Sequence, residues 1–120
     1  MILIESQIQP LIEEAKAAFP RLKDWQYNNE INEDYFGFSL WGEFILDPEE
    51  IMSRSYFVTF YTDKDQWSGT LTIGKPSYLW SSADVGDAHL VSTDDRDSLT
   101  EAISALKQEI KRLFTTLITD

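Results

Sequence analysis

The residues best suited to chemistry gather in the stretch SSADVGDAHLVSTDDRDSLTEA, which covers residues 81–102 and holds the only histidine of the chain. Asp84, Asp87 and His89 combine carboxylate and imidazole groups, which can bind zinc, manganese or iron. On an extended segment Asp87 and His89 would share a face, because side chains alternate along a strand. A full set of ligands would need a further residue from elsewhere in the fold. A metal site at these three residues is therefore one hypothesis, and a surface histidine between two turns is the other.

Enzymatic catalysis would need more than this acid and base. Asp87 and His89 would require a nucleophile or a substrate cleft, and no Gly-x-Ser-x-Gly turn surrounds the serines at positions 81, 82 and 92. The five glycines lie singly along the chain, so they cannot form a phosphate-binding loop. We therefore expect a protein without catalytic apparatus and without a cofactor. The alternative is a metal-dependent enzyme, or a protein that binds a metal or a small ligand, centred on residues 84–89.

The second half of this stretch has the features of a helix start. Ser98 and Glu101 are three residues apart, which is the spacing of a capping box at a helix N-terminus. Asp94, Asp95 and Asp97 precede the helix, where carboxylates interact favourably with the positive end of its dipole. These three aspartates therefore need no ligand to explain them.

Apolar residues at helical spacing mark a helix at each end of the chain. The N-terminal stripe consists of Ile4, Ile8, Leu11, Ala15 and Phe19, and the C-terminal stripe of Leu99, Ile103, Leu106, Ile110, Leu113 and Leu117, widened by Phe114 and Ile118. We expect both stripes to pack as core. The C-terminal spacing would also suit a coiled-coil dimer, but the stripe is short for that structure and lacks its charge pattern.

Between the helices the pattern changes to the alternation of β-strands. Residues 34–46 form one candidate strand, and residues 55–62 and 67–73 form a hairpin across a turn at 63–66. The predicted register pairs Thr62 with Trp67, Phe60 with Gly69, Val58 with Leu71 and Tyr56 with Ile73 on the apolar face, and Tyr61 with Ser68, Thr59 with Thr70 and Phe57 with Thr72 on the other. Residues 78–81 and 88–91 are shorter candidates, and Trp25 and Tyr27 indicate a further strand.

The order helix, antiparallel strands, helix predicts an α+β fold of two layers. We expect a meander sheet of about four to five antiparallel strands, with the N-terminal helix and the long C-terminal helix on one face. The chain is long enough for one hydrophobic core, so we expect residues 1–120 to form a single domain.

Aromatic residues are also expected on the sheet face away from the helices. The residues of this face that we predict to bind a partner are Tyr35, Trp41, Glu43, Phe57 and Tyr61. Aromatic side chains among serines and threonines are typical of a recognition surface. The alternative is that longer loops, or the segment at residues 78–84, fold over this face and bury it.

The charge of the chain excludes some partners. The net charge is −11, and residues 24–50 contain eight acids without a single Lys or Arg. Phosphate binding needs a basic stripe, so we expect no nucleic-acid partner. The charge of the C-terminal helix has the opposite sign, because Lys107, Lys111 and Arg112 outnumber the acid Glu109 there.

The remaining features favour a protein partner. No apolar run is long enough for a membrane span, and the cysteine-free sequence leads us to expect a cytoplasmic protein. We predict a protein–protein interaction module whose acidic field steers it to a basic protein. Homodimerisation through the exposed sheet face is a variant. The outline is similar to that of bacterial immunity proteins and secretion chaperones, an analogy of size and charge that suggests an immunity-, adaptor- or chaperone-like role.

Overall fold

The computed structural model describes residues 3–31, 36–46, 48–49, 54–63, 65–74 and 89–119. In these residues the chain order is helix, five strands, helix. The elements are α1 (Glu5–Ala18), β1 (Lys23–Ile31), β2 (Phe36–Leu46), β3 (Arg54–Asp63), β4 (Gln66–Ile73), β5 (His89–Ser92) and α2 (Leu99–Ile118). The strand candidate at residues 78–81 lies outside the described residues.

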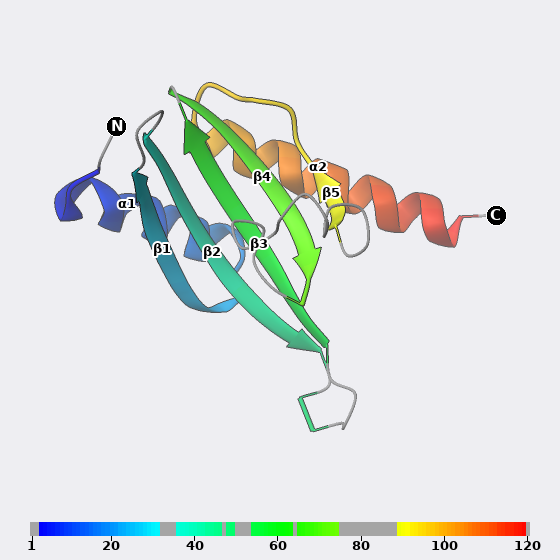
Figure 1. The fold of residues 1–120 in the computed structure, drawn as a ribbon. Helices are drawn as coiled ribbons and strands as arrows, with labels where there is room; N and C mark the ends of the chain where they lie inside the picture. The colour runs from blue at the N-terminus through cyan, green and yellow to red at the C-terminus, as the bar shows by residue number, and fades with distance from the viewer. Residues whose placement is uncertain are drawn as a thin grey trace.

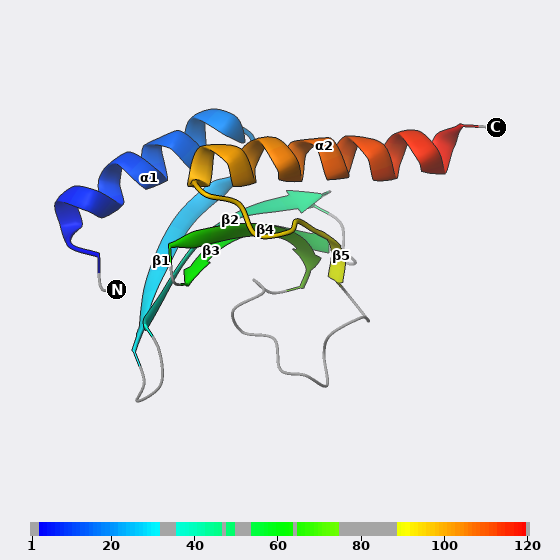
Figure 2. The same ribbon diagram turned by 90° about the horizontal axis from the view of Figure 1, so that it is seen from above.

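The five strands form one antiparallel sheet in which each strand pairs with the next along the chain (Figure 1). Figure 2 shows α1 and α2 on the same face of this sheet. The predicted α+β meander with two helices on one face is therefore confirmed. No helix in the described part of the chain is both long and apolar enough to cross a membrane.

The hydrophobic core lies between the two helices and the sheet face that they cover. Its buried residues are Leu3, Ile8, Ile12 and Ala15 at the N-terminus, Phe38, Leu40, Val58, Phe60 and Leu71 in the sheet, and Leu99, Ala102, Ile103 and Leu106 in α2. The sheet residues are at alternate positions of their strands, which places them on one face. Trp67 packs against this core, with its ring edge-on to Phe38 at a centroid distance of 6.2 Å.

The β3–β4 hairpin has the register that the alternation of its residues predicts. All seven predicted pairs are present, from Thr62 opposite Trp67 to Tyr56 opposite Ile73. The turn is shorter than expected, because Asp63 also pairs with Gln66. Asp65 lies in this turn with a φ of 68°, a left-handed conformation that Asp tolerates better than most residues.

Polar contacts connect α1 and the residues before it to the edge strand β1. The Tyr27 hydroxyl donates a hydrogen bond to a Glu5 carboxylate oxygen at 3.1 Å. This hydrogen bond and the negative charge of Glu5 raise the pKa of Tyr27. The Asn29 side chain accepts from the Leu3 amide at 3.4 Å and donates to the Leu3 carbonyl at 3.3 Å. These bonds fix the entry of α1 onto the sheet.

α2 is longer than the core that it covers. Its buried residues all lie in its first half, and Figures 1 and 2 show the second half extending past β5. Phe114, Leu117 and Ile118 are 48%, 71% and 79% exposed. The expectation that the whole C-terminal stripe packs as core is therefore wrong beyond Ile110, which is the last residue of the stripe to pack against the core.

Candidate functional site

The predicted partner-binding residues map to the sheet face away from the helices, except Tyr35, which lies outside the described residues. On this face Trp41 is 6% exposed and Phe57 is 9% exposed. Their cross-strand neighbours Thr59 and Thr72 are buried as well. Both aromatic side chains are therefore buried in the single chain.

Glu43 and Tyr61 are partly exposed among the residues of this predicted set that the structure describes. The Tyr61 ring lies close over Gly37, because a Cβ atom at Gly37 would be 2.7 Å from the Tyr61 hydroxyl oxygen. The Tyr61 ring therefore lies along the sheet. It covers the backbone at Gly37, which has no side chain of its own to cover it. Binding of a partner at this face stays a prediction.

His89 is the first residue of β5 and pairs with the buried Thr72. The β4–β5 pairing is irregular at this point, with a register shift between Leu71 and Thr72. Asp84 and Asp87 are outside the described residues. Within the described ranges no three His, Cys, Asp or Glu residues group together as metal ligands would. The metal site at Asp84, Asp87 and His89 stays a prediction.

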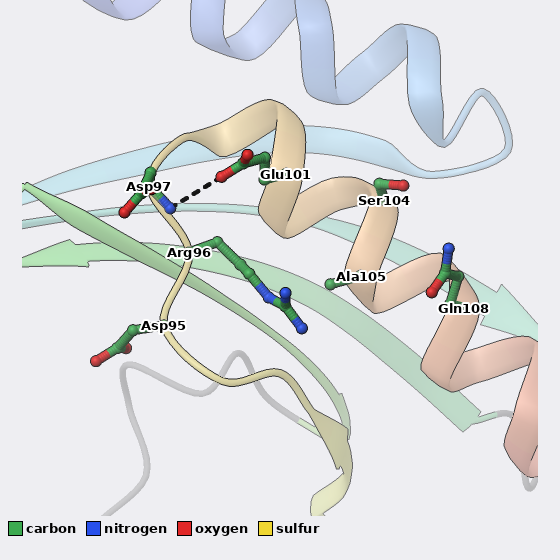
Figure 3. A pocket seen from close by; sticks show the side chains of 7 residues that line it. All are labelled: Asp95, Arg96, Asp97, Glu101, Ser104, Ala105 and Gln108. Atoms are coloured by element: carbon green, nitrogen blue, oxygen red, sulfur yellow. Dashed lines mark hydrogen bonds between the residues drawn. The ribbon is translucent and has the colours of Figure 1, made fainter.

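Hydrogen bonds surround the start of α2, and Figure 3 shows the one between Asp97 and Glu101. The Ser98 hydroxyl accepts a hydrogen bond from the Glu101 amide at 3.1 Å, as predicted for the N-cap. The Glu101 carboxylate accepts from the Asp97 amide at 3.1 Å, whereas a capping box would use the amide of Ser98 itself. Asp97 also accepts from the side chain of Gln66 at 3.2 Å. Asp97 and Glu101 border an open hollow of about 440 Å³, and the hydrogen bonds that they make are within the chain.

A second hollow lies on the helix side of the sheet, and we call it the apolar groove. It has a volume of about 420 Å³ and lies between the segment that follows α1, the second half of α2 and the ends of β2, β3 and β4. Its apolar lining includes Phe19, Leu22, Phe44, Tyr56, Ile110 and Phe114. Phe114 belongs to residues 113–118 of α2, which we call the α2 tip and which include the three most exposed apolar residues of the helix.

Two basic residues lie at the apolar groove of this acidic chain. Arg21 lines the groove, and the Lys107 Nζ lies 5.3 Å from the centroid of the Phe19 ring, a cation–π contact. Six of the ten Lys and Arg residues fall within residues 16–23 and 107–112. The single acid in these two segments is Glu109, which contacts Arg112 at 3.4 Å.

Sequence reasoning found the sign reversal in the last helix but missed the groove. Phe19 and Leu22 belong to one end of the chain and Ile110 and Phe114 to the other, so no local pattern connects them. Comparisons with protein-family models, curated proteins and solved structures find no match to this chain.

Proposed function

We propose that this chain is a non-enzymatic protein-interaction module and that the apolar groove with the α2 tip is its binding surface. The observation that carries this proposal is the exposure of Phe114, Leu117 and Ile118 beside an apolar hollow. Scattered apolar residues are normal on a protein surface, whereas a contiguous apolar patch with a polar border marks an interaction site. Burial of this patch by a partner would remove it from water and stabilise the complex.

The geometry fits recognition of a helical or extended apolar segment. α2 presents an apolar ridge at Leu117 and Ile118, and the groove next to it offers an apolar hollow lined by aromatic rings. Recognition of an amphipathic segment by such a groove relies on a few apolar anchors within a charged border. Lys107 and Lys111 would lie at that border and contact acidic or carbonyl groups of the partner.

The positive charge at the groove affects where the predicted basic partner could bind. A basic segment would be repelled by Arg21 and Lys107 at the groove, since like charges at an interface destabilise it. A basic protein would instead approach the opposite end of α2, where Asp95, Asp97 and Glu101 lie. The basic partner therefore remains part of the proposal at that end, where the acidic field would speed its association at low salt. The proposed cytoplasmic location rests on the cysteine-free sequence.

Site-specific photo-cross-linking in the native cells tests the proposed surface. A photoreactive residue in place of Leu117 should form a discrete adduct with one identified protein, because this side chain would be buried in the complex. The same residue in place of Glu13 of α1, which is exposed and lines neither hollow, is the control. Addition of Phe114→Asp should abolish the Leu117 adduct. Equal labelling at Leu117 and Glu13 would contradict the proposal.

A further inference from the structure

The second half of α2 lacks the support that the first half has. No residue after Leu106 in this helix is buried. Thr115, Thr116, Ile118 and Thr119 are β-branched and have low helix propensity. Short helical segments in water depend on packing of an apolar face for their stability. Packing of the apolar side of the α2 tip against another element would therefore stabilise its helical conformation.

The apolar stripe continues through the α2 tip with the spacing that it has over the core. Leu106, Ile110, Leu113 and Leu117 follow one another at intervals of four, three and four residues. Such a stripe lies along one side of a helix and packs against a second element. The sheet supplies that element for Leu106, which is fully buried, but not for Leu117, which is 71% exposed. Among the described residues no element packs against Leu117, and a second chain would supply one.

The same molecule carries an apolar ridge and an apolar hollow next to each other. We infer that a second copy of this chain covers the α2 tip, with the tip of each copy seated in the apolar groove of the other. This inference rests on the proposed function and names its partner. A two-fold axis near Phe114 would allow both contacts at once, because each copy offers the same self-complementary patch.

Charge complementarity favours an antiparallel arrangement of the two α2 helices. The C-terminal end of a helix carries about half a negative charge from its unpaired carbonyl groups. α2 has no basic residue in its own last turn to compensate for this charge. In an antiparallel pair, Lys107 and Lys111 of one copy would lie near the C-terminal end of the partner helix. A parallel pair would instead bring the lysines of the two copies together.

Light scattering over a range of protein concentrations tests the inference. The native chain should show twice the mass of one chain at high concentration and dissociate on dilution. Leu117→Asp should remain monomeric at the concentrations at which the native chain is dimeric, because it would bury an unpaired carboxylate in the interface. Residue 117 is largely exposed in the single chain, so this change should leave the circular dichroism spectrum and the folded state intact.

Thr116→Asp is the matched control, because it adds the same charge in the same helical turn on the side away from the stripe. It should dimerise as the native chain does. A native chain that stays monomeric at every concentration would overturn the inference, and so would a dimer that Leu117→Asp leaves intact. If the chain is monomeric while the Leu117 cross-link captures another identified protein, the proposed function stands and the second copy is rejected. If neither is observed, both proposals fail.

Discussion

Phe60→Ala should lower the free energy of unfolding by about 3–5 kcal/mol, the usual cost of removing a buried Phe side chain. Phe60 is fully buried at the centre of β3, and its ring lies 6.1 Å from that of Phe19. It also converges with Leu106 over Gly69, where an added Cβ atom would be 2.8 Å from Phe60 and 3.2 Å from Leu106. The cavity would therefore open where the sheet and both helices meet. Urea unfolding at a fixed, low protein concentration measures the loss.

Phe60→Leu separates the size of the cavity from other effects of the change. Leucine keeps much of the apolar volume, so the loss should be clearly smaller than for alanine. Since single domains are stable by only about 5–15 kcal/mol, the alanine variant should show a large fall in the urea midpoint. Equal losses for the two variants would contradict the packing that we describe at Phe60.

Gly42→Ala should destabilise the protein by about 1–3 kcal/mol, the usual cost of overpacking. A Cβ atom at Gly42 would lie 2.5 Å from the Trp25 ring, well below normal contact distance. The ring has little freedom to move, because Trp25 packs against the core next to an irregularity in the β1–β2 pairing, where Asp24 has a φ of 54°. Thermal unfolding of the variant measures the effect.

A double-mutant cycle with Trp25→Leu tests the cause of this loss. With the indole ring removed, Gly42→Ala should cost much less, and the variant should even gain stability. Alanine is more favourable than glycine in a strand by about 0.5–1 kcal/mol, because glycine loses more backbone freedom on folding. If Gly42→Ala is equally destabilising in both backgrounds, the Trp25 ring is not the reason that this position needs glycine.

The alternation of residues within one hairpin was enough to predict its register. A slip of one residue would have moved Phe60 and Val58 to the other face, so only one pairing separates the apolar and polar residues. The turn was predicted less well, because Asp65 adopts a left-handed conformation that is uncommon outside glycine and shortens the loop. Local residue patterns therefore predict strand pairing better than they predict residues with unusual φ angles.

The environment of each sheet face could not be predicted in the same way. The alternation correctly placed Trp41 and Phe57 on the face away from the helices, but exposure depends on what packs there and not on the strand itself. In α2 the expectation of core packing was wrong at Leu117, which belongs to the apolar stripe and is exposed in the fold. The residue beyond which a helix no longer contacts the sheet depends on the tertiary structure, and the spacing of apolar residues along the helix does not predict it.

The central claim is that the α2 tip is an interface. Amide hydrogen exchange in the second half of α2 tests this claim most directly. At protein concentrations that favour association, the amides of residues 114–118 should exchange slowly, because opening this segment requires dissociation of the partner copy. Their exchange should accelerate on dilution and in Leu117→Asp, while the amides of residues 103–106 in the core keep their protection. Rapid exchange of residues 114–118 at every concentration, unchanged by Leu117→Asp, would contradict the account.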